Sequence, residues 1–150
     1  MPSYTVRRQV RAPRDVVFDV LTDHEGYTRL TPLQWTLEKP GTPHPNGIGA
    51  VRAIRPTRRA PFAVREEVTE FESPSRFAYK VISGAPVRSH IGTVTLTDVP
   101  GGTQVEYTMD AEPKIPLPTR VVTGALRGLI SLLLRGVTKE AERRAVPRAS

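Results

Sequence analysis

Cysteine is absent from the 150-residue sequence. Its absence excludes disulfides, thiolate metal sites and cysteine nucleophiles, and it leaves the redox compartment undetermined. Long apolar runs are also absent, since the longest strongly apolar run, Leu129 to Leu134, is much shorter than the roughly 18 residues of a membrane span. The opening residues, MPSYTVRRQV, alternate like a strand and lack the apolar core of a signal peptide. We therefore expect a cytoplasmic protein.

Motifs for nucleotides, nucleophilic catalysis and metals are missing or incomplete. GIGAVR, from Gly47, lacks the third glycine and the following helix of a dinucleotide-binding loop, and the chain has no phosphate loop and no nucleophile elbow. Asp23, His24 and Glu25 are metal-ligand types, but adjacent helical residues point in different directions, and His44 lies in a Pro-rich loop. We interpret the three as surface residues and expect no metal site and no cofactor.

Acidic residues are outnumbered by basic ones, which gives a formal net charge of +7 and a pI near 10.4. The arginines are spread along the chain, and the densest cluster, Arg55, Arg58 and Arg59, falls in a predicted hairpin loop, IRPTRRAP. Net charge bears on association and not on fold. We interpret the charge as solvated surface and expect no nucleic-acid partner, with a polyanion or membrane surface as the alternative.

The length fits one domain over residues 1–150. Alternation predicts an opening strand over residues 3–10. Pro13, Asp15 and the helical spacing of Val16, Val17, Val20 and Leu21 predict a helix over APRDVVFDVLTD. A second short helix or turn, broken by Gly26 and stopped by Pro32, follows.

From Leu33 to Glu112 the hydrophobic period changes to two. It predicts six further strands, over residues 33–39, 48–54, 62–71, 76–82, 90–98 and 103–111. Their short connections favour antiparallel neighbours. After them, residues 119–145 place apolar side chains at spacings of three and four, at Val122, Leu126, Leu129, Leu133 and Val137. This pattern predicts a long helix that crosses the sheet, with Gly124, Gly128 and Gly136 marking either close packing or flexibility.

This order of elements resembles the helix-grip fold of the START and polyketide-cyclase-like superfamily, SRPBCC. The residues that carry the resemblance are VRAPRDVVFDVLTDHEGYTRLTP, REEVTEFESPSRFAYKV, VPGGTQVEYTMD and the final helix, which together span nearly the whole chain. One departure is Leu30, where the family commonly has Trp; Trp35 follows five residues later. The resemblance implies an α+β fold, a seven-stranded curved antiparallel sheet, two short helices after the first strand and a cavity between the sheet and the long C-terminal helix. Members of this superfamily include lipid carriers, hormone receptors and aromatase/cyclases, and fold alone does not choose among them.

Strand alternation identifies which residues would line that cavity. Arg52, Glu66 and His90 share a face with clear hydrophobes on three different strands, unless the register is shifted by one residue. A mainly apolar cavity with a few polar groups is the usual composition of a small-molecule site. The predicted ligand-binding residues are Tyr27, Trp35, Arg52, Ile54, Glu66, Val68, Tyr79, His90, Val94, Tyr107, Met109, Leu126 and Leu129.

Three functions compete at this stage. The first is binding of a small hydrophobic molecule, such as a lipid, a polyketide or a related metabolite. The second is a cyclase, aromatase or dehydratase with His90, Arg52 and Glu66 as catalytic candidates, in which His90 is the general acid or base and Arg52 or Tyr107 polarises a carbonyl. The third is a peripheral membrane or polyanion-binding module that uses the loop from Arg55 to Arg59 and the Arg-rich tail. We expect a small hydrophobic partner, transient membrane contact and a monomer or homodimer.

Overall fold

One antiparallel sheet of seven strands forms the body of the molecule, in the order β1-β7-β6-β5-β4-β3-β2. The computed structural model describes residues 2–146, so Met1 and residues 147–150 of the predicted domain lie outside the described part. The elements are β1 (Ser3–Val10), α1 (Arg14–Thr22), α2 (Tyr27–Leu30), β2 (Gln34–Lys39), β3 (Val51–Arg55), β4 (Val64–Glu72), β5 (Arg76–Ser83), β6 (Val87–Val99), β7 (Gly102–Pro113) and α3 (Thr119–Ala145).

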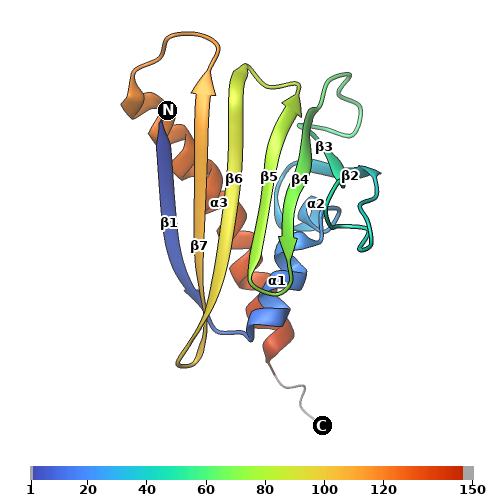
Figure 1. Ribbon diagram of the computed structural model, residues 1–150, viewed down its shortest axis with the longest axis vertical. Helices are drawn as coiled ribbons and strands as arrows, with labels where there is room; N and C mark the ends of the chain where they lie inside the picture. The colour runs from blue at the N-terminus through green and yellow to red at the C-terminus, as the bar shows by residue number, and fades with distance from the viewer. Residues whose placement is uncertain (1, 147–150) are drawn as a thin grey trace.

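The topology brings all three helices to one face of the sheet. Strands β2 to β7 pair with their neighbours in the chain, and β1 pairs with β7. The connection from β1 to β2, which carries α1 and α2, must therefore pass from one edge of the sheet to the other. Helix α3 runs along the same face (Figure 1). The arrangement confirms the predicted α+β helix-grip fold.

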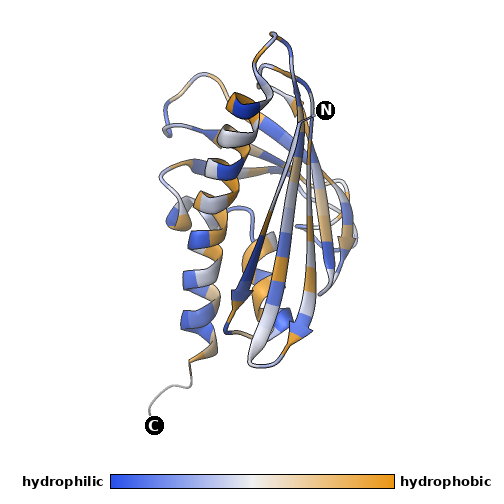
Figure 2. Cartoon of the chain, turned by 90° about the vertical axis from the view of Figure 1, so that its left-hand side faces the viewer, coloured by the Kyte–Doolittle hydropathy of each residue, from blue (hydrophilic) through white to orange (hydrophobic). Residues whose placement is uncertain are grey.

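Helix α3 covers the sheet with one side and shows polar residues on the other (Figure 2). Its buried residues recur at spacings of three and four: Val122, Leu126, Ile130, Leu133, Leu134, Val137 and Ala141. The predicted stripe included Leu129 and omitted Ile130. In the structure Ile130 is fully buried and Leu129 is only partly buried at the edge of the core.

The apolar character of α3 extends beyond its strongly apolar run. By length and composition alone, this 27-residue helix could cross a membrane. The run from Leu129 to Leu134 therefore underestimates the apolar length of this helix, because the less strongly apolar residues on either side also contribute to it. The same helix contains the residues that cover the sheet, and a core helix of a globular domain can be equally long and apolar.

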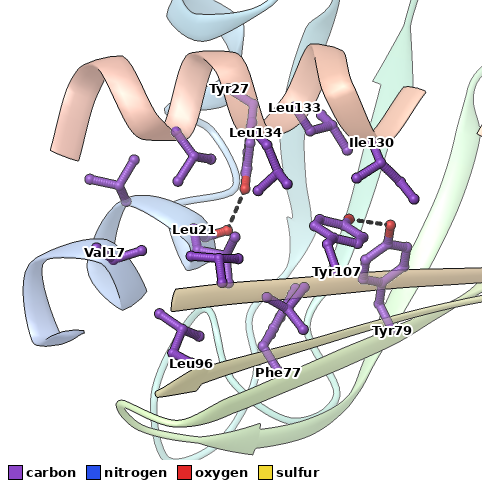
Figure 3. Close-up of a cluster of buried hydrophobic side chains, with 14 of the residues drawn as sticks. Val17, Leu21, Tyr27, Phe77, Tyr79, Leu96, Tyr107, Ile130, Leu133 and Leu134 are labelled. Carbon is purple, nitrogen blue, oxygen red and sulfur yellow. Dashed lines mark hydrogen bonds between the residues drawn. The ribbon is translucent and has the colours of Figure 1, made fainter. Parts of the chain in front are cut away.

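The core combines side chains from the sheet and from all three helices (Figure 3). Phe77, Tyr79, Leu96 and Tyr107 rise from the sheet, and they meet Val17 and Leu21 of α1, Tyr27 of α2, and Ile130, Leu133 and Leu134 of α3. The Tyr27 hydroxyl donates to the Leu21 carbonyl oxygen at 2.7 Å. This bond satisfies a buried polar group and ties α2 to the end of α1.

Two glycines allow close approaches that a side chain would block. A Cβ on Gly92 of β6 would lie 2.3 Å from Cζ of Tyr79, so the tyrosine ring occupies the space above that glycine. A Cβ on Gly136 of α3 would lie 2.9 Å from both Cβ and the carbonyl oxygen of Leu30, which shows that α3 and α2 pack closely there. By contrast, a Cβ on Gly124 or Gly128 would meet nothing within 4 Å.

Candidate functional site

The three ionisable residues singled out in the sequence lie in one row across the sheet. Arg52 on β3 pairs with Glu66 on β4, and Glu66 pairs with Val81 on β5. His90 on β6 lies one position beyond the last registered pair between β5 and β6, which joins Lys80 to Ile91. On its other side, His90 pairs with Ala111 on β7. The predicted strand parity is confirmed, because His90 is buried on the same face as Val94 and Leu96.

Arg52 and Glu66 form a buried ion pair. Their exposed fractions are 2% and 6%, and Nε and Nη2 of Arg52 lie 2.8 and 2.7 Å from Oε1 of Glu66. Burial alone would lower the pKa of Arg52, but the Glu66 carboxylate and the neighbouring hydroxyls of Tyr79, Tyr107 and Tyr27 together outweigh burial and raise the pKa above its ordinary value. Both contacts fall on Oε1, and Glu66 also lines the inner of the two cavities described below.

His24 is the third member of this network, which corrects its assignment to the surface. The ring has an exposed fraction of 0%. Its Nε2 lies 2.9 Å from the carbonyl oxygen of Asn46, which can only accept, and its Nδ1 lies 3.1 Å from Nη1 of Arg52, which can only donate. These partners require the neutral tautomer with the proton on Nε2. Burial, reinforced by the Arg52 charge, lowers the pKa of His24 to about 3.

Aromatic rings surround the Arg52 guanidinium. Its Cζ lies 4.4 Å from the ring centroid of Tyr79 and 5.0 Å from that of Trp35, with Phe77 and Tyr27 at 5.8 and 6.0 Å. Such contacts stabilise a desolvated cation through the negative face of each ring. Burial raises the pKa of the Tyr27, Tyr79 and Tyr107 hydroxyls, so all three stay neutral at pH 7.

Two apolar cavities lie between the sheet and α3. The inner cavity, about 220 Å³, is lined by Leu33, Trp35, Ile54, Val64, Glu66, Tyr79, Val81, Ala85, His90, Met109, Leu129 and Leu133. The outer cavity, about 280 Å³, is lined by Pro86, Val87, His90, Ala111, Pro113, Ile115, Leu117, Val121, Val122, Ala125, Leu126 and Leu129. His90 and Leu129 belong to both walls and therefore separate the two cavities.

His90 carries an unused polar atom at this boundary. The side chain is nine-tenths buried, and its Nε2 has no hydrogen-bond partner within residues 2–146. Burial lowers the pKa of His90, partly offset by the charges of Glu66 and Asp110. The imidazole is therefore neutral at pH 7. A buried polar atom without a partner costs free energy unless a ligand or water satisfies it.

The predicted ligand-binding residues divide between the cavity walls and the packed core. Those at the inner cavity are Trp35, Ile54, Glu66, Tyr79, His90, Met109 and Leu129, and Leu126 lines the outer cavity. Those that line neither cavity and lie in the buried core are Tyr27, Arg52, Val68, Val94 and Tyr107. Contact with a ligand remains a prediction for the first group. The side chains of the second group pack in the core beneath the cavity walls.

The catalytic candidates are not brought together as one open site. Arg52 is hydrogen-bonded to Glu66 and His24, and the Tyr107 hydroxyl is hydrogen-bonded to that of Tyr79. Neither Arg52 nor Tyr107 lines either cavity, so the expectation that one of them polarises a carbonyl is not supported. Of the three catalytic candidates, Glu66 and His90 do line the inner cavity.

Several wall residues escaped the sequence prediction. The largest omission is the segment after β7, where Ile115 and Leu117 line the outer cavity. Their alternation within the Pro-rich stretch EPKIPLP was an available signal. His24 also had a signal, since a buried arginine has five donors and one carboxylate cannot satisfy them all. Counting donors on Arg52 would have indicated a further acceptor.

The remaining motifs have structural roles. Among residues 2–146, no group of three or more His, Asp or Glu residues could hold a metal ion. Asp23 accepts a hydrogen bond from the Gly26 amide at 3.2 Å, and Glu25 accepts one from the Leu37 amide at 3.3 Å. Arg55 was predicted in a loop, but it ends β3 and lies 3.7 Å from Glu38. Arg58 and Arg59 are exposed in the loop between β3 and β4, as predicted.

Comparisons with known proteins agree with this architecture. A START superfamily protein from Mycobacterium smegmatis superposes with a TM-score of 0.79 at 12% identity, covering 94% of this chain and 97% of the other. A protein from Thermus thermophilus gives 0.74 at 18% identity, with coverage of 97% and 100%. Ara h 8.0201 gives 0.72 at 13% identity, with coverage of 93% and 96%. At these identities the likeness shows the fold alone.

A search of the curated proteins finds no match. The sequence does match a family model described as polyketide cyclase / dehydrase and lipid transport, over residues 1–144. That range includes every strand and the whole inner and outer cavity wall. The chain therefore belongs to the polyketide cyclase / dehydrase and lipid transport family, within the SRPBCC superfamily.

Proposed function

We propose that the protein binds a small, largely apolar molecule, such as a lipid, a polyketide or a related metabolite, in the two cavities between the sheet and α3. The observation that carries the proposal is their common boundary. Each cavity alone is slightly smaller than the roughly 300 to 1,000 Å³ typical of ligand sites, whereas the two together fall within that range. A ligand that displaces Leu129, which is only partly buried, would extend through both.

The chemistry of the walls supports the same function. Apart from Glu66 and His90, the lining side chains are aliphatic or aromatic. A ligand that fills this space removes apolar surface from water, on itself and on the protein, at about 25 cal/mol per Å². The two polar groups can fix its orientation. This is the composition of a site that binds mainly by burial and selects by a few hydrogen bonds.

Binding of the neutral fluorophore N-phenyl-1-naphthylamine tests the proposal. Replacing Leu129 by tryptophan fills the boundary between the cavities and should weaken binding by about tenfold or more, a loss of about 1.4 kcal/mol. Leu132→Trp is the matched control, because Leu132 is partly exposed on the same helix and lines neither cavity. Equal binding by the two variants would show that the fluorophore binds elsewhere.

A second candidate function is proton-transfer catalysis on such a molecule. The observation in its favour is the unpartnered Nε2 of His90, a neutral imidazole at the cavity boundary. Native mass spectrometry of the freshly purified protein separates the two functions. A carrier retains its ligand through purification, whereas an enzyme releases its product. If His90 transfers the proton, His90→Phe should lower turnover by about two to four orders of magnitude.

The rim of the outer cavity supports transient membrane contact as a route for ligand exchange. Ile115, Leu117 and Val121 are exposed there, with Lys114 and Arg120 beside them in the chain and also exposed. Exposed apolar side chains flanked by cations favour an anionic lipid surface. Cosedimentation with phosphatidylserine vesicles, but not with phosphatidylcholine vesicles, is the expected result. It should weaken in Ile115→Ser and at high salt; a failure to sediment would contradict it.

A further inference from the structure

A basic groove lies near the C-terminal end of α3, where this helix packs against α2. Its volume is about 540 Å³, larger than that of either apolar cavity. Leu30 of α2 and Gly136 of α3, which pack closely against each other, form its less polar part. Its other lining residues are all ionisable: Arg29, Lys139, Glu140, Arg143 and Arg144. The outward side of this half of α3 is correspondingly hydrophilic (Figure 2).

Glu140 holds two of these arginines in place. Nε and Nη2 of Arg143 lie 2.7 and 2.8 Å from its two carboxylate oxygens, and Nε of Arg144 lies 3.0 Å from Oε2. These hydrogen bonds lower the pKa of Glu140 to about 2, so the carboxylate is charged at pH 7. A guanidinium has five N–H donors, and both arginines use only some of theirs on Glu140. Two oriented arginines therefore keep donors for another acceptor.

Arg29 and Lys139 add positive charge that the groove does not compensate. Both side chains are exposed, and neither forms an ion pair with a residue in the described part of the chain. The nearby Glu142 accepts a hydrogen bond from the Arg11 amide and does not line the groove. The C-terminus of a helix contributes only about half a negative charge. The groove therefore has an excess of roughly two to three positive charges.

We propose that this groove binds a small molecule that carries a diphosphate group, at a site separate from the apolar cavities. Two linked phosphates carry about three negative charges at pH 7, close to the excess of positive charge. Arginine suits their oxygens because its planar fork donates parallel hydrogen bonds, and lysine adds a point charge. Four cations gathered around one groove match a compact anion better than an extended acidic peptide.

The groove is distinct from the sites of the proposed function, and this inference goes beyond that function. No residue of the groove lines the inner or the outer cavity. Val121, at the rim that is proposed to contact membranes, lies about 27 Å from Lys139 along α3, at 1.5 Å per residue. The two basic surfaces are therefore much farther apart than the Debye length of about 8 Å at physiological ionic strength.

Calorimetric titration with inorganic pyrophosphate, at physiological ionic strength and without divalent metal ions, tests the proposal. Pyrophosphate should bind about tenfold or more tightly than inorganic phosphate, because its second phosphate gains further hydrogen bonds to charged donors. Equal affinities would overturn the proposal. Tighter binding of polyglutamate or of oligothymidylate than of pyrophosphate would also overturn it, since the surface would then recognise an acidic peptide or a nucleic acid.

Variants locate the site. Arg29→Gln and Lys139→Gln each remove one cation of the groove, so each should weaken pyrophosphate binding by about threefold or more. Arg127→Gln is the matched control, because Arg127 is exposed on the same helix and lies outside the groove, so the affinity should stay nearly unchanged. An equal loss in Arg127→Gln and Lys139→Gln would overturn the proposal, because net charge alone would then attract the anion.

The double variant Arg29→Gln/Lys139→Gln separates this site from the apolar cavities. It should lose pyrophosphate binding by about tenfold and still bind N-phenyl-1-naphthylamine like wild type, since it changes neither cavity wall. Pyrophosphate binding that survives in the double variant would overturn the groove site and leave the cavity function standing. Loss of the fluorophore as well would overturn the independence of the two sites.

Discussion

Replacing Glu66 by glutamine should destabilise the protein more than any other single loss at the cavity wall. The amide keeps a hydrogen-bond acceptor for Arg52 but removes the charge that compensates it. With an exposed fraction of 2%, the guanidinium cannot reach bulk water. Removing one partner of a buried ion pair typically costs about 3 to 5 kcal/mol. For a chain of this length, that loss corresponds to a melting temperature lower by roughly 6 to 20 °C.

Removing both charges should restore most of this stability. In the double variant Arg52→Met/Glu66→Leu the methionine retains much of the apolar stem among Tyr79, Trp35 and Phe77. Replacing a complete buried pair by apolar residues is often neutral or stabilising. One cost remains, because Nδ1 of His24 loses its donor, and an unsatisfied buried acceptor costs about 1 to 3 kcal/mol. We expect the double variant within about 2 kcal/mol of wild type.

Urea unfolding at pH 7, followed by circular dichroism, measures these values. Arg52→Met alone should cost about as much as Glu66→Gln, so the cycle should be strongly non-additive. A double variant as unstable as the sum of the singles would refute the reasoning, since the pair would then be stabilising in its own right. Single losses below about 1 kcal/mol would also refute it, because the charges would then be solvated.

Buried contacts elsewhere in the molecule lead to three more predictions. His24 is neutral in the folded protein, with a pKa of about 3 against an ordinary value of 6.5. Its contribution to the free energy of unfolding is therefore complete above pH 6.5 and is lost as the pH falls toward 3, with a loss of about 2 kcal/mol at pH 5. His24→Gln should flatten the dependence of urea stability on pH. Gly92→Ala should cost about 1 to 3 kcal/mol in urea unfolding, because Tyr79 must move, whereas Gly124→Ala, with open space around it, should stabilise the helix by about 1 kcal/mol. Truncation after Pro118 should abolish the cooperative thermal transition, since each buried side chain of α3 contributes about 1.5 to 3 kcal/mol; a melt near that of the full chain would contradict this.

Strand parity made the fold and the row of ionisable residues predictable. Side chains alternate strictly in a strand, so Val94 and Leu96 fix the direction of His90 without knowledge of the partner strands. The same argument placed Arg52 with Ile54 and Glu66 with Val68. The sequence pattern of each strand was sufficient here, because the hydrophobic residues of a strand show which of its two faces is buried.

Other features depended on contacts between distant segments. His24 lies in a polar stretch between two short helices, and its burial follows from Arg52 and Asn46, which no local pattern reports. The choice between Leu129 and Ile130 depends on the rotation of α3 about its axis, and two adjacent apolar residues cannot fix that rotation. Val68 and Val94 share the predicted face, but neighbouring side chains fill the space above them instead of leaving a cavity.

The glycines of α3 give its two halves different local stability. Gly136 is pressed against Leu30, whereas Gly124 and Gly128 face open space next to the residues that wall the outer cavity. Each of these two glycines costs about 1 kcal/mol of helix stability relative to alanine, and nothing packs on them in return. Amide protons in the first turns should therefore exchange with solvent through local opening, while those beyond Ile130 exchange only on global unfolding. A bound molecule that contacts Ala125 and Leu126 would slow amide exchange in those first turns. Hydrogen exchange there would therefore show whether the outer cavity is occupied.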